Sequence, residues 1–425
     1  MNGSDISYLN SLLENTDIKI VERENKIFIN KNINGYWYEI LFENDCIFFK
    51  YIIKTRKKTN FSNLSRAFEP KEADWEFIRR HASMVYVIIA KSCNSKCKVC
   101  FAQGLIKPED MDVDDIKYVL SKIGNNKKFM FFGLEPTVND NLFNMIKIVE
   151  KSGNIPTLFT NGLKLANPDY VKELKLAGLK EVFVSFDGFK DVYKKLDSEN
   201  DYNLKVEALK NLENNKIFTF LALVFMEGIN ENEIPKLVSF LMRHKDFIKG
   251  LFLVPLSPFG KLEISQKKFF TYSDIIKNIA RSGNVKCDKD YFVEFERFKF
   301  NIHKLLLKFR KNVPTGSQII TVPFKISDNS LNEVISTKDL KRINLHLENG
   351  HLYNLVGYLP KFIKFWSLLL NSTKFYYTNL NRGLIYISIY QITTDFNYIP
   401  FWTHSVGIIK QKMKDGKNAM MFNCI

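Results

Sequence analysis

The sequence predicts an α/β fold: a partial (β/α)6 TIM-like barrel with a small strand-rich module before it and an α+β region after it. Three observations predict this architecture. Between Met84 and Pro255, six short apolar segments alternate with longer amphipathic segments. The connections are short, which implies parallel strands joined by right-handed crossovers. Six units, where a closed barrel has eight, predict a sheet that is open on one side.

The predicted strands are short and apolar, and a longer helical segment follows each of the first five. The first strand, MVYVIIA, is an unbroken apolar run that is typical of a buried strand. The strands are predicted at residues 84–90, 128–133, 157–160, 181–186, 218–225 and 250–255. The helices are predicted at residues 113–124, 140–153, 168–178, 202–215 and 230–244.

The strand-rich module is predicted within residues 1–80. Segments 19–31 and 35–54 both alternate apolar and polar residues, as strands with one covered face do. The sequence NING at 32–35 lies between them and is a turn signal. The charged stretch 54–74 is expected to connect this module to the barrel.

After the barrel the pattern is less regular, with a helix predicted at 298–311 and a strand at 383–394. We expect this last region to cover the substrate. The predicted domains are therefore a strand-rich module, residues 1–80, a barrel domain, residues 81–260, and a C-terminal region, residues 261–425.

The chain carries a formal charge of +16, because 62 lysines and arginines outnumber 46 aspartates and glutamates. Such an excess favours acidic partners: nucleic acid, anionic lipid or an acidic redox protein. A genome biased toward lysine, asparagine, isoleucine and phenylalanine would give the same excess. No stretch interleaves arginine with aromatic residues as a nucleic-acid surface does, so we expect no nucleic-acid partner.

No transmembrane segment is predicted. The apolar run at 355–370 is interrupted by Pro360 and two lysines. The first ten residues lack the pattern of a signal peptide, so a cytoplasmic location is expected. Cys46, Cys287 and Cys424 are scattered without a pairing rhythm, which predicts reduced thiols rather than a disulfide scaffold.

Three further cysteines, Cys93, Cys97 and Cys100, follow the first barrel strand with the spacing C-x₃-C-x₂-C. Structural zinc usually takes four ligands in paired short spacings, and the sequence offers no second pair. Three thiolates on one tight loop suit three irons of a [4Fe–4S] cube, with the fourth iron open to a small chelating ligand. Zinc-binding or buried cysteines remain the alternative interpretation.

Distinctive residues also come at the ends of the next five strands, where barrel enzymes place their catalytic groups. Taken alone, each would be interpreted as a turn or a helix cap, and a proline suits the start of a helix. Their appearance after successive strands predicts one shared site. These residues are Gly133-Leu134-Glu135-Pro136, Thr160-Asn161, Ser185, Asp187, Asn230 and Val254-Pro255.

The three-cysteine segment resembles the signature of the radical SAM superfamily. The resemblance implies a [4Fe–4S] cluster held by Cys93, Cys97 and Cys100, whose fourth iron binds the amino and carboxylate groups of S-adenosylmethionine (SAM). It also implies the reaction: an electron from the cluster cleaves SAM to a 5′-deoxyadenosyl radical, which abstracts hydrogen from an unactivated C–H bond. An acidic electron donor, flavodoxin or ferredoxin, would then be a partner.

The resemblance also implies which residues bind SAM. GLEP resembles the superfamily's Gly-Gly-Glu-Pro motif, whose backbone and carboxylate hold the ammonium of SAM. Leu134 replaces the second glycine, which requires that this position not adopt a positive φ. Ser185 and Asp187 are candidates for ribose or methionyl contacts. The implied set is Phe101, Gly133, Leu134, Glu135, Pro136, Thr160, Asn161, Ser185, Asp187, Asn230, and Val254 with Pro255 as an apolar wall for adenine.

Longer segments resemble the archaeal tetraether lipid synthase group and its methanopterin-methylating relatives. The similarity extends beyond the barrel to residues 28–40 and 267–279. Those relatives carry extra cysteines in the N-terminal module and the C-terminal tail, which bind additional metal centres. Here those cysteines are missing and only Cys424 lies near the end, so we expect a single cluster.

Three functions from different classes follow from these observations. The first is a SAM-cleaving enzyme with a lipid or other apolar substrate, for which the aromatic stretch 355–377 would line a pocket or contact a membrane surface. That stretch would equally suit an ordinary core with a solvated lysine face. The second is a peptide maturase whose N-terminal module adds a leader peptide as an extra strand. The third is a binding protein with a degenerate barrel, which the intact cysteine loop argues against.

Overall fold

The computed structural model describes residues 18–23, 26–31, 36–43, 46–52, 75–76, 78–79, 82, 84–100, 109–256, 261–265, 270, 272–307, 319–351, 355, 357–358, 384–390, 405–412 and 418–424. The chain divides into two compact units. One comprises Met1–Arg66, Ile392–Phe401 and Asn423–Ile425, and the other comprises Ala67–Gln391 and Trp402–Phe422. The division predicted at residues 80 and 260 stays a prediction.

The first unit contains a four-stranded antiparallel sheet in which each strand pairs with the next along the chain. Its strands are β1 (Ile18–Arg23), β2 (Lys26–Lys31), β3 (Tyr36–Glu43) and β4 (Cys46–Ile52). Two-residue connections join β1 to β2 and β3 to β4, as expected for β-hairpins. The strand-rich character predicted for this part of the chain is confirmed.

The second unit is built on a twelve-stranded sheet whose centre is the predicted series of six parallel strands. Each of the six is hydrogen-bonded to the next in sequence order. The strands are β5 (Met84–Ala90), β7 (Lys128–Gly133), β8 (Ile155–Thr160), β9 (Glu181–Ser185), β10 (Phe218–Phe225) and β11 (Ile248–Pro255). This arrangement confirms the predicted α/β fold with its partial barrel.

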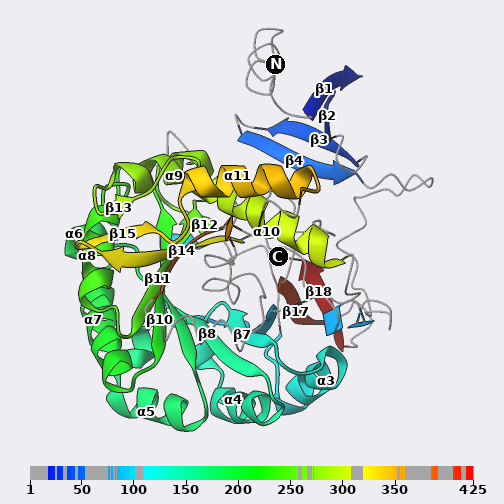
Figure 1. The fold of residues 1–425 in the computed structure, drawn as a ribbon. Coiled ribbons are helices and arrows are strands. Elements are labelled where there is room, and N and C mark those ends of the chain that lie inside the picture. The colour runs from blue at the N-terminus through cyan, green and yellow to red at the C-terminus, as the bar shows by residue number, and fades with distance from the viewer. Residues whose placement is uncertain are drawn as a thin grey trace. The chain divides into compact units, whose positions relative to one another are not determined.

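Helices between these strands cover the outer face of the curved sheet (Figure 1). They begin where local signals place them: Asp112 caps α3 with a capping box, and Asn167 caps α5 ahead of Pro168. The helices are α3 (Val113–Ile123), α4 (Leu142–Lys151), α5 (Pro168–Leu176), α6 (Lys190–Lys195), α7 (Glu199–Asn214) and α8 (Ile234–Arg243). Of these, α6 was not predicted as a separate helix.

The C-terminal part of the chain adds a parallel strand to each side of the six. β16 (Ile385–Tyr390) pairs with β11, and β17 (Ser405–Lys412) pairs with β5. The sheet continues past them through β14 (Ile319–Ser327), β15 (Ser330–Glu333) and β13 (Val285–Lys286) on one side and β18 (Asn418–Cys424) on the other. Helices α9 (Tyr272–Arg281), α10 (Tyr291–Leu307) and α11 (Thr337–Glu348) complete this part. Eight neighbouring strands are therefore parallel, two more than the βα series predicts.

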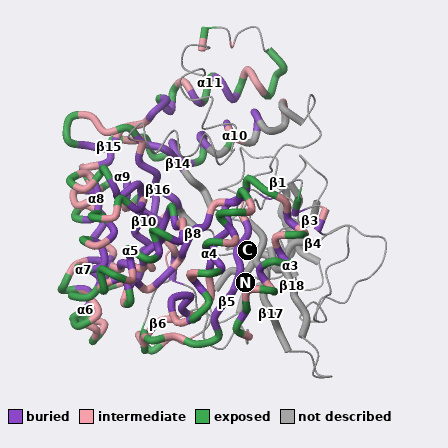
Figure 2. The backbone as a smooth tube through the Cα atoms, turned by 90° about the horizontal axis from the view of Figure 1, so that it is seen from below, coloured by how far each residue is buried: buried purple, intermediate pink, exposed green. Residues whose placement is uncertain are grey.

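The alternation of side chains divides each barrel strand between two apolar layers. On β5, Val85, Val87 and Ile89 are fully buried in the main core between the sheet and the helices. Tyr86 and Ile88 lie on the opposite, inner face of the same strand. Figure 2 shows the barrel strands as largely buried, whereas exposed residues gather on the helices and loops.

Six aromatic rings pack in succession across the inner face. Neighbouring ring centroids lie 4.8 to 6.1 Å apart. Gly250 makes room for one of them, because a Cβ there would lie 2.9 Å from the Phe220 ring and 2.2 Å from the Tyr386 carbonyl oxygen. We call this set the aromatic belt; it consists of Tyr86, Phe132, Phe159, Phe183, Phe220 and Phe252.

Lys127 and Lys128 are buried at the N-terminal end of the barrel strands. Lys128 forms an ion pair with Glu181 at 2.8 Å, and both side chains are almost completely buried. Lys127, 5% exposed, donates through Nζ to the carbonyl oxygens of Arg79 and Ala82 at 3.0 and 2.5 Å. These charges are satisfied within the fold, as buried ionised groups must be.

Within the described residues, no helix is both long enough and apolar enough to cross a lipid bilayer. Four predicted features fall outside the described residues: the turn at 32–35, the connector at 54–74, Phe101, and most of the aromatic stretch 355–377.

Candidate functional site

The three cysteines lie on the loop that leaves β5, at the C-terminal end of the barrel. Cys93 and Cys100 are half-buried, and Cys97 is exposed. Cys100 ends a short strand, β6 (Val99–Cys100), which pairs antiparallel with β12 (Lys261–Leu262). The cysteine loop is therefore fixed to the segment that follows the last of the six barrel strands.

Polar groups surround two of the sulfurs. The Ser95 N–H donates to Cys93 Sγ at 3.4 Å, and Ser95 Oγ lies 3.2 Å from Cys97 Sγ. The Asn161 side-chain amide lies 3.7 Å from Cys93 Sγ. Loss of hydration at the sulfur atoms raises the pKa of both thiols, although Cys97 as a whole residue is exposed, and the hydrogen bonds from Ser95 partly offset that rise. The thiols are therefore protonated at neutral pH without metal, and binding a cluster must release their protons.

This donor set fits an iron–sulfur cluster. Cys93, Cys97 and Cys100 lie on one short loop, and each can offer one thiolate to a different iron of a [4Fe–4S] cube. A structural zinc ion usually takes a fourth ligand as well. Cys93, Cys97 and Cys100 would hold the cube.

The GLEP segment turns tightly against the start of the cysteine loop. Gly133 has a φ of +140°, and a Cβ there would lie 3.0 Å from the Ala90 carbonyl oxygen. Leu134 is not among the described non-glycine residues with positive φ, so leucine fits where the motif has glycine. The backbone N–H groups of Leu134 and Glu135 donate to the carbonyls of Ala90 and Ser92 at 3.3 and 3.1 Å.

The Glu135 carboxylate is only 1% exposed and accepts four hydrogen bonds from the protein. Oε1 accepts the Thr137 N–H at 3.1 Å and the hydroxyls of Thr137 and Thr160, both at 2.6 Å. Oε2 accepts the Asn161 N–H at 2.7 Å. The carboxylate thus joins the ends of β7 and β8. It also caps a 3₁₀ turn, η2 (Pro136–Val138), which begins at Pro136.

Asn161 connects this cluster of hydrogen bonds to the cysteine loop. Its side-chain amide donates to Asn94 Oδ1 at 2.8 Å as well as facing Cys93. Its Oδ1 accepts the N–H of Leu163, the first residue of the turn η3 (Leu163–Ala166), at 2.9 Å. The predicted residues Thr160 and Asn161 are therefore brought together with Glu135 and the first cysteine.

Asp187 and Ser185 lie at the end of β9. Asp187 Oδ1 accepts the Val224 N–H at 2.9 Å, and the Asp187 N–H donates to the Tyr193 hydroxyl at 3.1 Å. Burial raises the pKa of Asp187, while nearby Lys205 and the Val224 hydrogen bond lower it. Ser185 is half-buried, and its alternation with Phe183 directs it to the inner face of the sheet.

The side chain of Asn230 is fully used by the backbone around it. Nδ2 donates to the carbonyls of Asp187 and Val224 at 3.0 and 2.7 Å, and Oδ1 accepts the Met226 N–H at 2.8 Å. Asn230 is 1% exposed. It therefore holds the end of β10 against the loop that carries Asp187.

Val254 and Pro255, predicted to form an apolar wall, end β11. Alternation places Val254, which is half-buried, on the same inner face as Phe252 of the aromatic belt. Pro255 is buried and lies on the opposite face with Leu253. Of the two predicted residues, Val254 is the one that the strand directs toward the inside of the barrel.

Lys205 is a residue of this site that the sequence analysis missed. Its Nζ donates to the carbonyls of Asn161, at 2.8 Å, and of Ser185. One signal was present: in α7, a lysine occupies position i of an apolar stripe that continues at i+3, i+4 and i+7 with Ala208, Leu209 and Leu212. A lysine on the covered face of a helix needs buried partners.

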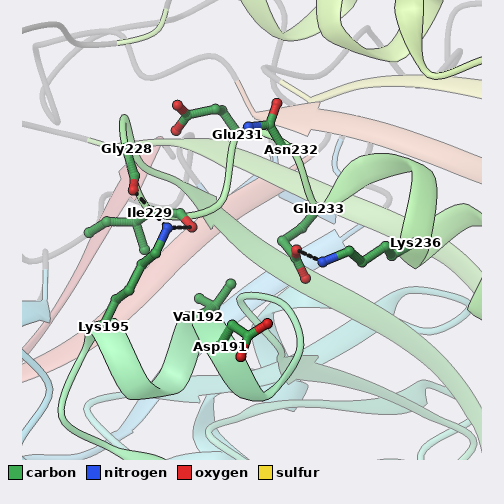
Figure 3. Close-up of a pocket in the computed structure, with 9 residues that line it drawn as sticks. All are labelled: Asp191, Val192, Lys195, Gly228, Ile229, Glu231, Asn232, Glu233 and Lys236. Carbon is green, nitrogen blue, oxygen red and sulfur yellow. Dashed lines mark hydrogen bonds and ion pairs between the residues drawn. The ribbon is translucent and has the colours of Figure 1, made fainter.

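A pocket of about 310 Å³ is lined by residues of α6, of the segment 228–232 and of the start of α8 (Figure 3). Lys195 of α6 donates across it to the carbonyls of Gly228 and Ile229 at 3.0 and 3.3 Å. On its other side, Glu233 accepts the Phe189 N–H at 3.0 Å and pairs with Lys236 at 2.7 Å. These contacts tie α6 and α8 to the loops of the site.

Comparison with known proteins gives the same picture. Residues 87–241 match the Radical SAM superfamily. The chain is 30% identical over 186 residues to the 7,8-dihydro-6-hydroxymethylpterin dimethyltransferase of Methanocaldococcus jannaschii. The aligned region covers 41% of this chain and 36% of that enzyme. It is 26% identical over 229 residues to the GTP 3′,8-cyclase of Clostridium botulinum, covering 52% of this chain and 71% of the cyclase. The chain thus spans about a third of the first relative.

Among solved structures, the chain is similar to Streptococcus suis SuiB bound to S-adenosylmethionine, with a TM-score of 0.41, 15% identity and coverage of 50% of this chain and 52% of that one. It is also similar to coproporphyrinogen III oxidase (HemN) of Escherichia coli, with a TM-score of 0.36, 12% identity and coverage of 50% and 54%. With the superfamily match over residues 87–241, and with three cysteines following the first barrel strand, this chain contains a radical SAM domain; enzymes of that superfamily use a [4Fe–4S] cluster and S-adenosylmethionine.

Proposed function

We propose that this protein cleaves SAM reductively at a single [4Fe–4S] cluster held by Cys93, Cys97 and Cys100. When bound, the cluster supplies the electron that splits SAM into methionine and a 5′-deoxyadenosyl radical, which takes hydrogen from an unactivated C–H bond. The observation that carries the proposal is the connection of the cysteine loop to the ends of β7 and β8, through Glu135 and Asn161.

The residues of the site have separate tasks in this proposal. Gly133 and Leu134 present backbone carbonyls beside the cysteine loop, where the ammonium of SAM would bind. The buried Glu135 carboxylate fixes that backbone and the end of β8. Ser185 and Asp187 would contact the ribose or the methionyl group, and Val254 would face the adenine. Orientation and exclusion of water are what the protein adds to the chemistry of the cofactor.

The proposal of a single cluster rests on where the other cysteines lie. Cys46 and Cys424 belong to strands β4 and β18, each remote in sequence from the loop. Cys287 is half-buried, and burial raises its pKa to about 12. Such a thiol resists conversion to the thiolate that binds iron. About four irons per chain are therefore expected after anaerobic reconstitution, and about eight would contradict a single cluster.

An apolar substrate is the first candidate, because the aromatic belt covers the inner face of the sheet beneath the site. Phe132 and Phe159 are its half-buried members, and each is the next-to-last residue of its strand. An apolar inner wall suits a lipid or another hydrophobic molecule. Flotation with liposomes tests whether the protein also contacts a membrane surface; failure to float would contradict peripheral binding.

A peptide maturase is the second candidate, and the four-stranded antiparallel sheet of the first unit favours it. Its outermost strands, β1 and β4, each pair with one neighbour in the described residues, so either could take a peptide as an added strand. A gene for a short precursor peptide beside this one would support the maturase. Turnover of lipids and no reaction with such a peptide would exclude it.

The experiment that tests the main proposal uses the reconstituted protein with SAM and dithionite under anaerobic conditions. Formation of 5′-deoxyadenosine is expected, and its absence would favour a binding protein with a degenerate barrel. Deuterated candidate substrates, with the label followed into 5′-deoxyadenosine, then identify the carbon that loses hydrogen.

The proposed electron donor is an acidic flavodoxin or ferredoxin of the cytoplasm, so turnover with it should fall as salt screens the positive surface.

A further inference from the structure

Lys205 of α7 is a buried lysine inside the site. It is 5% exposed and lies on the covered face of its helix. Removing an ammonium from water is costly unless the protein replaces the lost hydrogen bonds. The partners of Lys205 therefore indicate what it does.

Those partners lie at the ends of two neighbouring barrel strands. Nζ donates to the carbonyl of Asn161, which follows β8, and to the carbonyl of Ser185, which ends β9. It also lies 5.7 Å from the centroid of the Tyr193 ring, a favourable position for a cation. Two carbonyls and a ring face account for the three donors of an ammonium. Lys205 is therefore engaged by the protein rather than free to bind a ligand.

The surroundings of Lys205 are otherwise acidic. Burial lowers the pKa of Lys205, and the carboxylates of Asp187, Asp201 and Glu135 act in the opposite direction, as a Cys97 thiolate also would. Three cluster-binding thiolates would add negative charge, and each reduction of the cluster would add one more. A cation that is buried beside such charge stabilises it far better than it would in water.

We propose that Lys205 is a positioning residue for SAM cleavage: its ammonium fixes the strand ends that carry Asn161 and Ser185, and its charge raises the reduction potential of the cluster. Asn161 is the direct link, because its backbone carbonyl accepts the lysine while its side-chain amide lies 3.7 Å from Cys93 Sγ. This inference rests on the proposed function, since it presupposes the cluster.

Three variants distinguish the effect of the Lys205 charge on the cluster from the general effect of removing a buried lysine. Lys205→Met removes the charge and both hydrogen bonds, and Lys205→Arg keeps a cation at the position. Lys127→Met is the matched control, because Lys127 is also 5% exposed and also donates to two backbone carbonyls. Lys127 precedes β7, so it lies at the opposite end of a six-residue strand, about 20 Å from the site.

The measurement is a redox titration of each reconstituted protein, followed by the EPR signal of the reduced cluster. At a fixed solution potential, we expect the ratio of reduced to oxidised cluster to fall about tenfold in Lys205→Met, which corresponds to about 59 mV for a one-electron couple. Lys205→Arg should stay within about twofold of the natural protein, and Lys127→Met should match it.

Equal potentials in Lys205→Met and Lys127→Met would overturn the inference. If Lys205→Met takes up no iron, Lys205→Gln, which keeps a donor for one carbonyl, is titrated in its place with the same expected fall. If the natural protein binds no cluster or forms no 5′-deoxyadenosine, the proposed function itself fails. Intact cleavage with an unchanged potential in the lysine variants would refute only the role of Lys205.

Discussion

The Thr160 hydroxyl donates to Glu135 Oε1 across 2.6 Å, and this hydrogen bond joins the ends of the neighbouring strands β7 and β8. The same carboxylate accepts the Asn161 N–H at 2.7 Å, one residue further along. Glu135 is 1% exposed, so these bonds form away from water, where they are strongest. The geometry on which the cysteine loop depends is therefore fixed by one buried carboxylate.

Replacing Glu135 with glutamine should loosen this arrangement. The amide nitrogen of glutamine is a hydrogen-bond donor. It would face an N–H or O–H group that now donates to a carboxylate oxygen, and that hydrogen bond would be lost. We expect the free energy of unfolding to fall by about 2 kcal/mol and the affinity for SAM to weaken. Urea denaturation and equilibrium binding of SAM measure the two effects. Glu173→Gln, on the exposed surface of α5, is the control and should change neither.

Ser95→Ala tests the contacts to the cluster sulfurs. The substitution removes the hydroxyl beside Cys97 Sγ and leaves the backbone N–H that faces Cys93. One lost hydrogen bond of about 1 kcal/mol should lower the reduction potential by about 40 mV. The potential is read from an EPR-monitored redox titration. Ser121→Ala, on the exposed side of α3, should leave it unchanged, and an equal shift in both variants would refute the assignment.

Glu181→Gln should destabilise the fold at the far end of the barrel from the cysteines. It leaves the Lys128 ammonium buried without its counterion. Breaking a buried ion pair from one side costs about 3–5 kcal/mol. Glu207→Gln, which breaks an exposed pair with Lys210, should cost less than about 1 kcal/mol. Similar losses in the two variants by urea denaturation would contradict the buried character of the first pair.

Stability should also depend on the protonation of Lys127. Burial lowers its pKa to about 8, below the ordinary 10.5 of an unfolded lysine. Between these values the unfolded state binds more protons than the folded state, so the free energy of unfolding rises with pH. Between pH 8 and pH 10.5, the free energy of unfolding of the natural protein should rise by up to about 3 kcal/mol more than that of the Lys127→Met variant. Parallel pH profiles of the two proteins would show that the lysine does not carry the effect.

Local pattern in the sequence predicts the centre of this fold well. Strands β5, β7 and β10 have the bounds predicted from their apolar runs, and the cysteines follow the first of them. The parallel pairing of β16 with β11 and of β17 with β5 was not predicted. These paired strands lie more than a hundred residues apart in the sequence. Their pairing depends on tertiary packing, which the local pattern of apolar residues does not reveal.

The structure brings the predicted residues Glu135, Thr160 and Asn161 together with Cys93, and their contacts with a ligand stay predictions. Glu135 and Asn230 follow strand ends, as the sequence predicts, yet the polar side-chain atoms of both are already hydrogen-bonded within the protein. Lys205 carries no motif, and its partners Asn161 and Ser185 become visible only when α7 is packed on the sheet. Which polar atoms remain open to a ligand depends on these contacts, and spacing along the chain does not reveal them.

The central claim is that three thiols of one loop hold the cluster at which SAM is cleaved. Its most direct test compares the natural protein with Cys93→Ala after anaerobic reconstitution, by iron analysis and by formation of 5′-deoxyadenosine from SAM and dithionite. The natural protein should contain about four irons per chain and form the nucleoside, and the variant should lose most of its iron and all of the product. A Cys93→Ala protein with its full iron content and undiminished 5′-deoxyadenosine would contradict the account.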